Sequence, residues 1–367
     1  MKLRHYQQRC ADFLALRKRA LCVVPAGGGK TIIAASALAM IADPWDRIGW
    51  ACNTREQVEQ GKAALAAVGL SVAWVKCIAG LQREDTAEID FLVIDETHHL
   101  PSRTWSLVTD ACQGVIWGLT ATPKSGDPDR DWMFRRFWGE GNTIKVDREE
   151  VIAGGHLALG RVVILDIDQP GEFDDEIEAE AKAAAILMQR KCRMLAKDEV
   201  LRRCKWQVTL SRLIENPMRH AACVATAGRE MENGQSVLIL VAQIEQGQKL
   251  KDVITDSELA HSKMGTKKRR AAIAAFRNGS LRCLIATSLA DEGMDVPRAS
   301  CLILMTAGRS GSKIEQRTGR VMRPHEGKGV GLVYDFADAG ASMAKAQGLA
   351  RRRVYKQLGY SVETLTQ

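Results

Sequence analysis

Short apolar runs alternate with stretches of helical pattern along most of the chain. Short buried runs separated by helical segments are typical of βαβ units, in which crossover helices join parallel strands. In the first half we expect strands at Ala20–Val24, Ile48–Cys52, Val72–Lys76, Phe91–Asp95 and Val115–Leu119. A second series is expected at Ser236–Val241, Glu258–Ala260, Arg282–Ala286, Cys301–Met305 and Gly329–Tyr334. The pattern therefore predicts an α/β protein with two units, each built around a parallel sheet.

The segment between the two series has a different pattern. After a break at Gln169-Pro170-Gly171, the residues from Glu172 to about Ile214 read as one almost continuous helix. Acids lead this stretch and bases follow, which suits the dipole of a helix that starts near Asp174. Asn216-Pro217 should end it, because the residue before proline disfavours the helical conformation. We therefore expect a mainly helical linker or insertion.

Composition places the chain among folded globular proteins. Its 367 residues correspond to two to three domains of about 150 residues. A hydrophobic fraction of 46% and a charged fraction of 26% exclude a disordered or fibrous chain. The ranges that we expect are 1–150 for the first domain, 151–215 for the linker with its helical insertion, 216–340 for the second domain and 341–367 for a basic C-terminal helix.

Neither a membrane span nor a metal or disulfide scaffold is expected. The longest apolar run, Thr31–Ala42, is shorter than the roughly 20 residues that span a bilayer. Met1–Gln7 lacks the apolar core that a signal peptide needs, so we expect no signal peptide. The ten cysteines occur singly, without a CxxC pair, which argues against a zinc site and a disulfide framework. We expect reduced thiols and a cytoplasmic protein.

The charge distribution indicates a polyanionic partner. The net charge is +8, and three basic runs, Lys182–Arg219, Lys263–Arg282 and Gly340–Tyr360, carry net charges of +7, +7 and +5. An acidic run without any base, Asp166–Glu180, precedes the first of them. One basic run is also typical of a solvated helix face, but three together favour a phosphate-binding surface.

A glycine-rich loop lies between the first expected strand and a helix. The sequence from Val23 to Thr31 reads Val-Val-Pro-Ala-Gly-Gly-Gly-Lys-Thr. Glycines let successive backbone N–H groups point at phosphate oxygens, Lys30 is placed to reach the β and γ phosphates, and Thr31 to bind Mg²⁺. The strict pattern has glycine where Val24 stands, and the alternative is a glycine-rich turn before a helix. The expected phosphate-binding residues are Ala26, Gly27, Gly28, Gly29, Lys30 and Thr31.

An acidic pair follows the most apolar strand of the first half. Asp95-Glu96-Thr97-His98 comes directly after Phe91–Ile94, at the carboxyl end of a strand, where open α/β sheets bind ligands. Asp95 is suited to hold Mg²⁺ through water, and Glu96 to orient and deprotonate an attacking water. His98 and His99 do not form a zinc pattern such as HExxH, so no metal is expected on them.

The order of these segments resembles the superfamily-2 helicases of the DEAD/DEAH type over nearly the whole chain. The Leu-Arg-x-Tyr-Gln opening and the compact size look most like the UvsW/XPB-like DNA helicases, of which phage and prophage versions are common. The resemblance implies two tandem RecA-like domains with parallel sheets. The segments that carry it are Leu3–Gln7, Val24–Thr31 (motif I), Asn53–Gln57 (Ia), Asp95–His98 (II), Gly118–Pro123 (III), Ala286–Pro297 (V) and Gln316–Arg323 (VI).

The resemblance also implies residue roles at the nucleotide. Arg320 and Arg323, with Gln316, would act from the second domain, and an arginine there stabilises charge on the transferred phosphoryl group. The alternative is an exposed basic helix, because a spacing of three residues puts both arginines on one face. The further residues implied at the nucleotide are Arg4, Gln7, Gly293 and Asp295.

Contacts to nucleic acid are implied at the phosphate backbone, which carries no sequence information. For Arg202, Arg203 and Lys205 we expect a helical element that binds duplex or branched DNA; the alternative is pairing with the acids of 166–180. Trp206 beside them is suited either to stack at a duplex junction or to pack against the second domain. The aromatic cluster at 132–138 is read as a core helix rather than a stacking platform. The backbone-contacting residues implied by the resemblance are Thr54, Arg55, Thr122 and Thr287.

The function that these features predict is an ATP- and Mg²⁺-dependent DNA helicase or translocase, acting as a monomeric motor with possible replication or recombination partners. An RNA helicase is the first alternative, although the DEAD tetrapeptide is replaced by Asp-Glu-Thr-His. The others are a non-catalytic ATP-switched clamp or loader and the motor of a defence complex.

Overall fold

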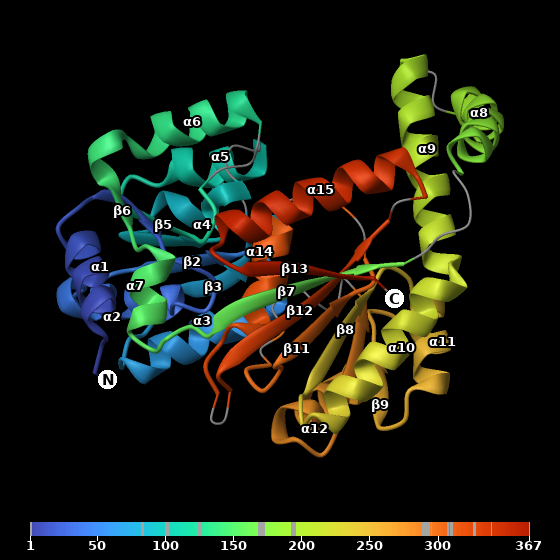
Figure 1. Ribbon diagram of the computed structural model, residues 1–367. Coiled ribbons are helices and arrows are strands. Elements are labelled where there is room, and N and C mark those ends of the chain that lie inside the picture. Colours follow the sequence, from blue (N-terminus) through green and yellow to red (C-terminus); the bar gives the residue numbers. More distant parts are fainter. Residues whose placement is uncertain are drawn as a thin grey trace. The chain divides into compact units, whose positions relative to one another are not determined.

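The computed structural model describes two compact units, Met1–Leu157 and Ala158–Asp291 with Asp295–Gln367 (Figure 1). The description covers all residues except 1, 82–83, 100–102, 124–126, 168–172, 192–195, 288–293, 295, 307, 309–310, 326–327, 339 and 367. Each unit is a parallel sheet covered by helices, as the alternation of apolar runs and helical segments predicts. The predicted pair of α/β units is therefore confirmed.

The first unit has a six-stranded sheet in the order β3-β2-β4-β5-β1-β6, with every pair parallel. Its strands are β1 Arg19–Val23, β2 Ile48–Cys52, β3 Trp74–Cys77, β4 Phe91–Asp95, β5 Val115–Thr120 and β6 Thr143–Lys145. Its helices are α1 His5–Ala15, α2 Lys30–Ile41, α3 Arg55–Ala67, α4 Glu84–Ala87, α5 Arg103–Ala111, α6 Pro128–Trp138 and α7 Arg148–Ala153. The five predicted strands are confirmed, and the short edge strand β6 is an addition.

The second unit has a seven-stranded parallel sheet in the order β13-β7-β12-β11-β8-β10-β9. Its strands are β7 Leu159–Asp166, β8 Val237–Val241, β9 Ser257–Ala260, β10 Cys283–Thr287, β11 Cys301–Leu304, β12 Val330–Ala337 and β13 Ser361–Thr366. Its helices are α8 Asp174–Lys191, α9 Lys197–Glu215, α10 Pro217–Glu232, α11 Ile244–Val253, α12 Thr266–Asn278, α14 Gly311–Val321 and α15 Ser342–Gln357. The five strands predicted here are also present.

Two strands of this sheet come from segments that the sequence pattern assigned differently. β7 lies in the range expected to be linker, yet it pairs with β12 over eight residues. β13 follows α15 at the end of the range expected to be a basic helix, and it pairs with β7. Val162–Leu165 of β7 are continuously apolar and buried, which is typical of a strand covered on both faces.

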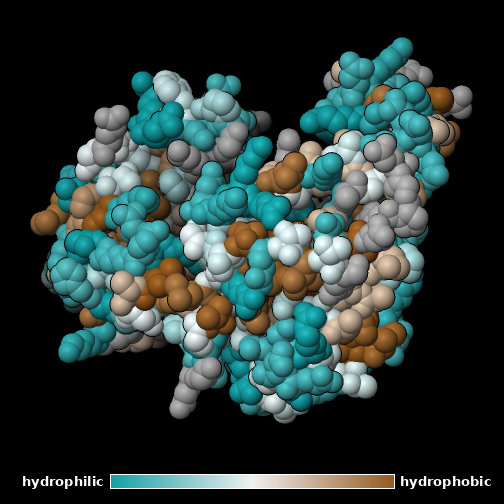
Figure 2. All heavy atoms as spheres, viewed as in Figure 1, coloured by the Kyte–Doolittle hydropathy of each residue, from teal (hydrophilic) through white to brown (hydrophobic). Residues whose placement is uncertain are grey.

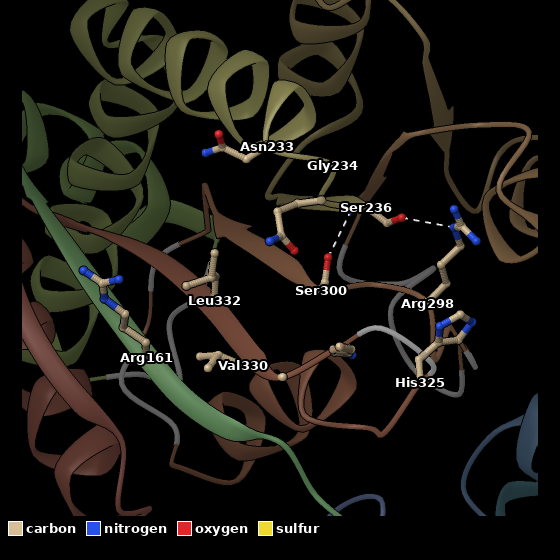
Figure 3. A pocket seen from close by; sticks show the side chains of 12 residues that line it. Arg161, Asn233, Gly234, Ser236, Arg298, Ser300, His325, Val330 and Leu332 are labelled. Atoms are coloured by element: carbon tan, nitrogen blue, oxygen red, sulfur yellow. Dashed lines mark hydrogen bonds between the residues drawn. The ribbon is translucent and has the colours of Figure 1, made fainter.

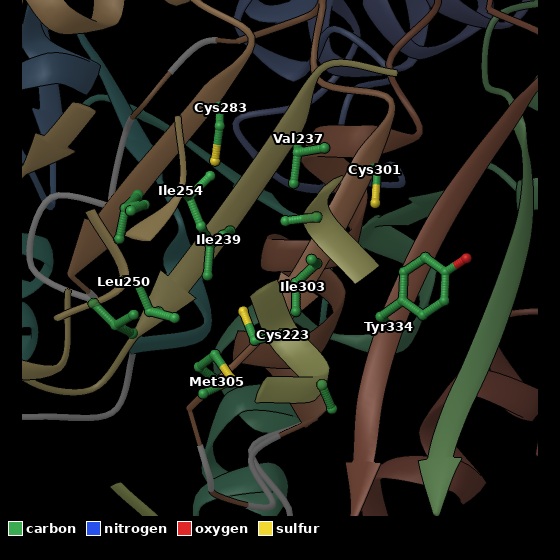
Figure 4. Close-up of a cluster of buried hydrophobic side chains, with 14 of the residues drawn as sticks. Cys223, Val237, Ile239, Leu250, Ile254, Cys283, Cys301, Ile303, Met305 and Tyr334 are labelled. Atoms are coloured by element: carbon green, nitrogen blue, oxygen red, sulfur yellow. The ribbon is translucent and has the colours of Figure 1, made fainter. Parts of the chain in front are cut away.

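The core of the second unit is aliphatic and sulfur-rich (Figure 4). Side chains of β8, β10 and β11 meet those of α10 and α11, as with Ile239 and Ile303 against Cys223 and Leu250. Burial raises the pKa of the Cys223 thiol to about 12, so it stays protonated. All nine described cysteines are free, in agreement with the expected reduced thiols.

The predicted continuous helix is instead a hairpin of two helices, α8 and α9, which pack against each other. Ile177 and Ala181 of α8 meet Val200, Cys204 and Val208 of α9. An amphipathic stretch of this length cannot bury its apolar face as one straight helix, so reversal of the chain lets the two halves bury each other. In Figure 2 the hairpin surface at the upper right is mainly hydrophilic, with small apolar patches.

The ends of the hairpin follow the sequence signals. α8 begins at Asp174, with three acids in its first turn, and α9 ends at Glu215 directly before Asn216-Pro217. The Asn216 side chain accepts hydrogen bonds from the backbone N–H groups of Met218 and Arg219 and thereby caps α10. Among the described helices, none is both long and apolar enough to cross a membrane.

Candidate active site

The glycine-rich loop joins the carboxyl end of β1 to the start of α2. Gly27 and Gly29 have φ angles of +87° and +85°, a region that residues with a side chain rarely adopt. The Gly28 N–H donates to Pro25 O at 2.9 Å, and a Cβ on Gly28 would lie 2.5 Å from Val24 Cγ1. The loop is thus a tight turn that only glycine fits, and it presents the N-terminal N–H groups of α2, which suit a phosphate.

The N-terminal segment holds this loop through the Gly28 carbonyl. Tyr6 Oη donates to Gly28 O at 2.9 Å and Gln7 Nε2 donates to the same oxygen at 3.2 Å. Arg4 Nη1 donates to Tyr6 Oη at 3.0 Å, and the Arg4 N–H donates to Gln7 Oε1 at 3.1 Å. Gln7 therefore contacts the phosphate loop itself. Tyr6 was not predicted as a site residue, and only its position next to Gln7 pointed to it.

The acidic pair stands at the end of β4, opposite Lys30. Lys30 Nζ lies 3.9 Å from Glu96 Oε1, and Asp95 Oδ1 accepts the N–H of Glu96 at 2.9 Å. Burial, and then the neighbouring charge of Glu96, raise the pKa of Asp95 to about 6. A cation beside such a carboxylate stabilises its ionised form, because the attraction offsets the cost of desolvation.

Glu96 has a left-handed backbone, with φ +51°, which is uncommon and strained for glutamate. This turn directly after a buried strand brings its carboxylate to Lys30 on one side and His98 on the other, with His98 Nδ1 3.3 Å from Glu96 Oε2. The strain is retained where it positions the predicted catalytic base.

His98 connects the acidic pair to the segment after β5. Its Nδ1 lies 3.2 Å from Thr120 Oγ1, and the Thr120 hydroxyl donates its one hydrogen to Thr122 O at 3.1 Å. The Thr120 oxygen therefore acts as the acceptor in this contact, so Nδ1 carries the hydrogen, and Glu96 Oε2 lies nearby. The sequence analysis considered His98 only for zinc, and this link depends on the pairing of β4 with β5.

These residues fit a nucleotide with a magnesium ion. The loop N–H groups and Lys30 suit the phosphates, while Thr31 and the buried Asp95 offer oxygens to the metal. In the described part of the chain, no cluster of three or more His, Cys, Asp or Glu side chains forms a metal site. An ion held by phosphate oxygens, one hydroxyl and water needs no such cluster.

The arginines expected at the nucleotide lie in the second unit, Arg320 within α14 and Arg323 just after it. Arg320 is only 8% exposed, which does not fit the alternative of a solvated basic helix. Gln316 and Arg323 are partly exposed. Arg317 Nη1 donates to Thr306 Oγ1 at 2.9 Å and so ties α14 to the segment after β11. The remaining motif V residues expected at the nucleotide, Gly293 and Asp295, lie outside the described residues.

The four implied backbone contacts occupy ends of strands or helices. The Thr54 hydroxyl accepts the N–H of Gln57 and caps α3, and Arg55 is exposed at the start of that helix. Thr287 is the last residue of β10, and Thr122 follows β5 by two residues. The hydroxyls of Thr122 and Thr287 are buried without a hydrogen-bond partner among the described residues.

The basic residues of α9 form ion pairs at the surface of the hairpin. Arg202 and Arg203 both contact Glu199, at 2.5 and 2.8 Å, and Lys205 Nζ lies 2.6 Å from Glu178. Pairing with the acidic run, the alternative considered from the sequence, thus occurs for Lys205. Exposed pairs of this kind contribute little to stability, so they do not prevent the same cations from exchanging to phosphates.

The helix α6 behaves mainly as a core helix, as predicted. Phe134 and Trp138 are buried and stack edge to face with ring centroids 6.3 Å apart. Trp132 is the exception, since 56% of it is exposed and the Arg136 guanidinium lies 5.5 Å from its ring.

A polar pocket opens at the amino edge of the second sheet (Figure 3). Arg298 Nε donates to Ser236 Oγ at 3.2 Å, and the Ser236 N–H donates to Ser300 Oγ at 3.0 Å. Lys328, which also lines it, donates to Pro297 O at 3.1 Å. This edge is opposite to the one where open α/β sheets bind ligands, so the pocket is not part of the candidate active site.

Two parallel-sheet units, one with a phosphate loop facing an acidic pair, define the class of tandem RecA-like nucleoside triphosphatases. Residues 219–325 match the family described as "Helicase conserved C-terminal domain", and residues 76–125 match "Type III restriction enzyme, res subunit". Within that class the chain resembles the superfamily-2 helicases, and among them the XPB-like DNA helicases.

Over the aligned residues, about a quarter of the positions are identical between this chain and its relatives. A protein described as a helicase in Sulfolobus islandicus filamentous virus is 27% identical and matches 69% of this chain and 43% of its own length. The DNA 3'-5' helicase Rad25 of Haloarcula marismortui is 25% identical, over 88% of this chain and 51% of its own length. The DNA 3'-5' translocase XPB2 of Sulfurisphaera tokodaii is 23% identical, over 88% of this chain and 79% of its own length. The chain thus spans about half the length of the first two relatives.

Solved structures confirm the fold. S. cerevisiae Dbp5 bound to RNA and ADP BeF3 matches with a TM-score of 0.67 over 100% of this chain and 90% of that chain, at 15% identity. The type ISP restriction-modification enzyme LlaBIII bound to DNA matches with the same score over 100% of this chain and 31% of that chain, at 14% identity. Tandem RecA-like domains, predicted from the resemblance, are therefore confirmed.

Proposed function

We propose that this protein is an ATP-dependent DNA helicase or translocase. The observation that carries the proposal is the arrangement at one edge of the first sheet, where Lys30 stands opposite the buried Asp95 and the strained Glu96. A non-catalytic clamp would need the phosphate loop but not a carboxylate held in strain beside the phosphate site.

The site residues of the first unit have separate parts in hydrolysis. The loop N–H groups and Lys30 bind the phosphates, and Mg²⁺ held near Thr31 and Asp95 would neutralise charge on them. Glu96 orients the attacking water and takes its proton. His98 Nδ1 lies 3.3 Å from the Glu96 carboxylate and is hydrogen-bonded to the Thr120 hydroxyl.

We further propose that the second unit completes the site. Arg320 and Arg323, with Gln316, act on the transferred phosphoryl group when the units close on ATP, and Gly293 and Asp295 lie at the nucleotide. Hydrolysis then releases the closed state, so that the cycle of ATP biases a two-state motion. Support comes from the motif order and from the burial of Arg320.

DNA is the proposed track because the relatives with named substrates act on DNA, in the 3'-5' direction. Sequence-independent contacts through Thr54, Arg55, Thr122 and Thr287 follow the backbone. The hairpin residues Arg202, Arg203 and Lys205 are proposed to contact the phosphates of duplex or branched DNA.

ATP turnover measured in parallel with single-stranded DNA, duplex DNA, forked DNA and RNA tests the proposal. We expect DNA to stimulate turnover more than RNA does, together with ATP-dependent displacement of a strand or of a bound streptavidin block. Turnover that no nucleic acid changes would refute the motor function, and stimulation by RNA alone would favour the RNA helicase.

A further inference from the structure

A large groove lies on the second unit, between α9, α14 and α15. It has a volume of about 890 Å³ and is bounded below by residues that follow β8 and β11, namely Ala242 and Thr306. It therefore opens at the carboxyl edge of the parallel sheet, the edge at which this class of sheet binds ligands. The groove lies wholly within one unit, so its shape does not depend on how the units are placed.

The side chains around the groove carry positive charge. Arg202 and Arg203 line it from α9, Lys313 from α14 and Arg353 from α15, and none of the described lining residues is acidic. Arg202 and Arg203 share the one carboxylate of Glu199. Lys313 and Arg353 are exposed and form no ion pair with the described residues. An extended anion is the ligand that this distribution fits.

The inner surface of the groove is apolar and offers a flat ring. Trp206 and Leu210 are one turn apart on α9, so they share a face. α15 packs against α9, and its lining residues include Ala346 and Ala350, also one turn apart. Side chains that end at Cβ leave room beside the partly exposed indole. A basic groove with an accessible aromatic ring is what proteins use to bind unpaired bases.

A polar atom in the groove also lacks a partner. Gln347 lines it from α15, and its Oε1 is buried without a hydrogen bond to any described residue. An unsatisfied acceptor of this kind is costly, and the exocyclic amino or ring N–H groups of a nucleobase supply a donor. Stacking on the indole of Trp206 needs an unpaired base, because the base faces of duplex DNA are covered by their neighbours.

We propose that this groove binds an unpaired strand, with phosphates along the cations and one base stacked on Trp206. The proposal rests on the proposed DNA motor function and adds where the second unit holds the unpaired strand of a branched DNA. Trp206 is then a residue that distinguishes a separated strand from duplex.

Anisotropy with a labelled oligothymidine of about 12 nucleotides and with a blunt duplex of the same length tests this. Trp206→Ala should weaken binding of the single strand about 5- to 150-fold, the contribution of one stacked base, and leave duplex binding unchanged. Trp206→Phe should retain most of the affinity. The matched control is Trp132→Ala, since Trp132 is also an exposed tryptophan beside an arginine but lies on the first unit, and it should change neither affinity.

A crosslinking measurement on the wild-type chain supports the result independently of any folding defect. Oligothymidine that carries iododeoxyuridine should crosslink to the peptide that contains Trp206. Unaltered single-strand affinity of Trp206→Ala, an equal loss on duplex, or crosslinks confined to other peptides would each overturn the proposal. If instead the wild-type protein hydrolyses no ATP with DNA, the motor function fails, while binding and crosslinking still decide the groove.

Discussion

The half-buried Lys328 makes the stability of the second unit depend on pH. Burial, and then the positive charge of Arg323, lower the pKa of Lys328 to about 7, whereas an unfolded lysine titrates near 10.4. Among the described residues, its ammonium donates to two backbone carbonyls, those of Pro297 and Ala299. The folded state therefore disfavours the charged form of this side chain.

The sign of the effect follows from proton counting. Above about pH 7 the unfolded chain binds more protons at this lysine than the folded chain does, so the free energy of unfolding rises with pH. One pKa unit corresponds to about 1.36 kcal/mol. Raising the pH by two units from 7, where the folded group is already half titrated, should add about 1–2 kcal/mol once its partial exposure is allowed for.

Buried cysteines change the free energy of unfolding in the opposite direction as the pH rises. Burial raises the pKa of Cys223 to about 12, while unfolded cysteine titrates near 8.5, so ionisation of unfolded thiols lowers stability at high pH. The measured quantity is therefore the difference in free energy of unfolding between the wild type and Lys328→Met, in which the cysteine contribution cancels.

Urea titrations followed by circular dichroism under reducing conditions, fitted with two transitions, give this difference. We expect it to grow by about 1–2 kcal/mol from pH 7 to about pH 9. Lys345→Met, which removes an exposed lysine of α15, should show no such growth. A difference that stays constant or shrinks with pH would refute the assignment of a depressed pKa to Lys328.

Three further outcomes are expected. Arg320→Ala should lower kcat by about 10³-fold or more with little change in ATP affinity measured by equilibrium binding; an equal loss in both would contradict a transition-state contact. Replacing Arg202, Arg203 and Lys205 by alanine should reduce the slope of log K against log salt on duplex DNA by about two to three units, whereas an unchanged slope with a lower Tm would show that they serve only in ion pairs. Tyr6→Phe, which removes a hydroxyl that holds the phosphate loop, should raise the KM for ATP about 5- to 10-fold, a loss of about 1–1.5 kcal/mol, and an unaltered KM would show that this hydrogen bond does not support the loop.

Sequence patterns predicted the central strands well because their apolar runs are bounded by polar residues. β2 and β4 agree with the predicted limits at both ends. β7 was read as linker because no helical segment separates it from a strand of its own series. β13 was read as part of a basic C-terminal helix, because a largely exposed edge strand lacks a continuous apolar run. Pairing of these two strands is a long-range property of the sheet.

In the candidate site, too, local features were predicted and contacts between distant segments were not. Lys30, Asp95 and Glu96 were predicted from local spacing, since a loop between strand and helix and the end of a strand are local features. The hydrogen bonds from Tyr6 to Gly28 and from His98 to Thr120 join segments more than twenty residues apart. No local pattern encodes them, and the left-handed backbone of Glu96 likewise depends on the surrounding fold.

The reversal of the hairpin was not predicted for a related physical reason. The amphipathic pattern of α8 and α9 specifies which faces are apolar, but not that the partner of each face is the other helix. Contact of Ile177 and Ala181 with Val200 and Cys204 decides that the chain folds back on itself.

The central claim is that Glu96 is the base of a DNA-stimulated ATP hydrolysis site, and Glu96→Gln tests it most directly. Equilibrium binding of ATP and turnover with DNA should be measured on the wild type, on this variant and on Lys30→Ala. The account predicts that Glu96→Gln binds ATP as the wild type does but loses turnover by about 10²- to 10⁴-fold, while Lys30→Ala loses binding itself. Near wild-type turnover by Glu96→Gln in the presence of DNA would contradict it.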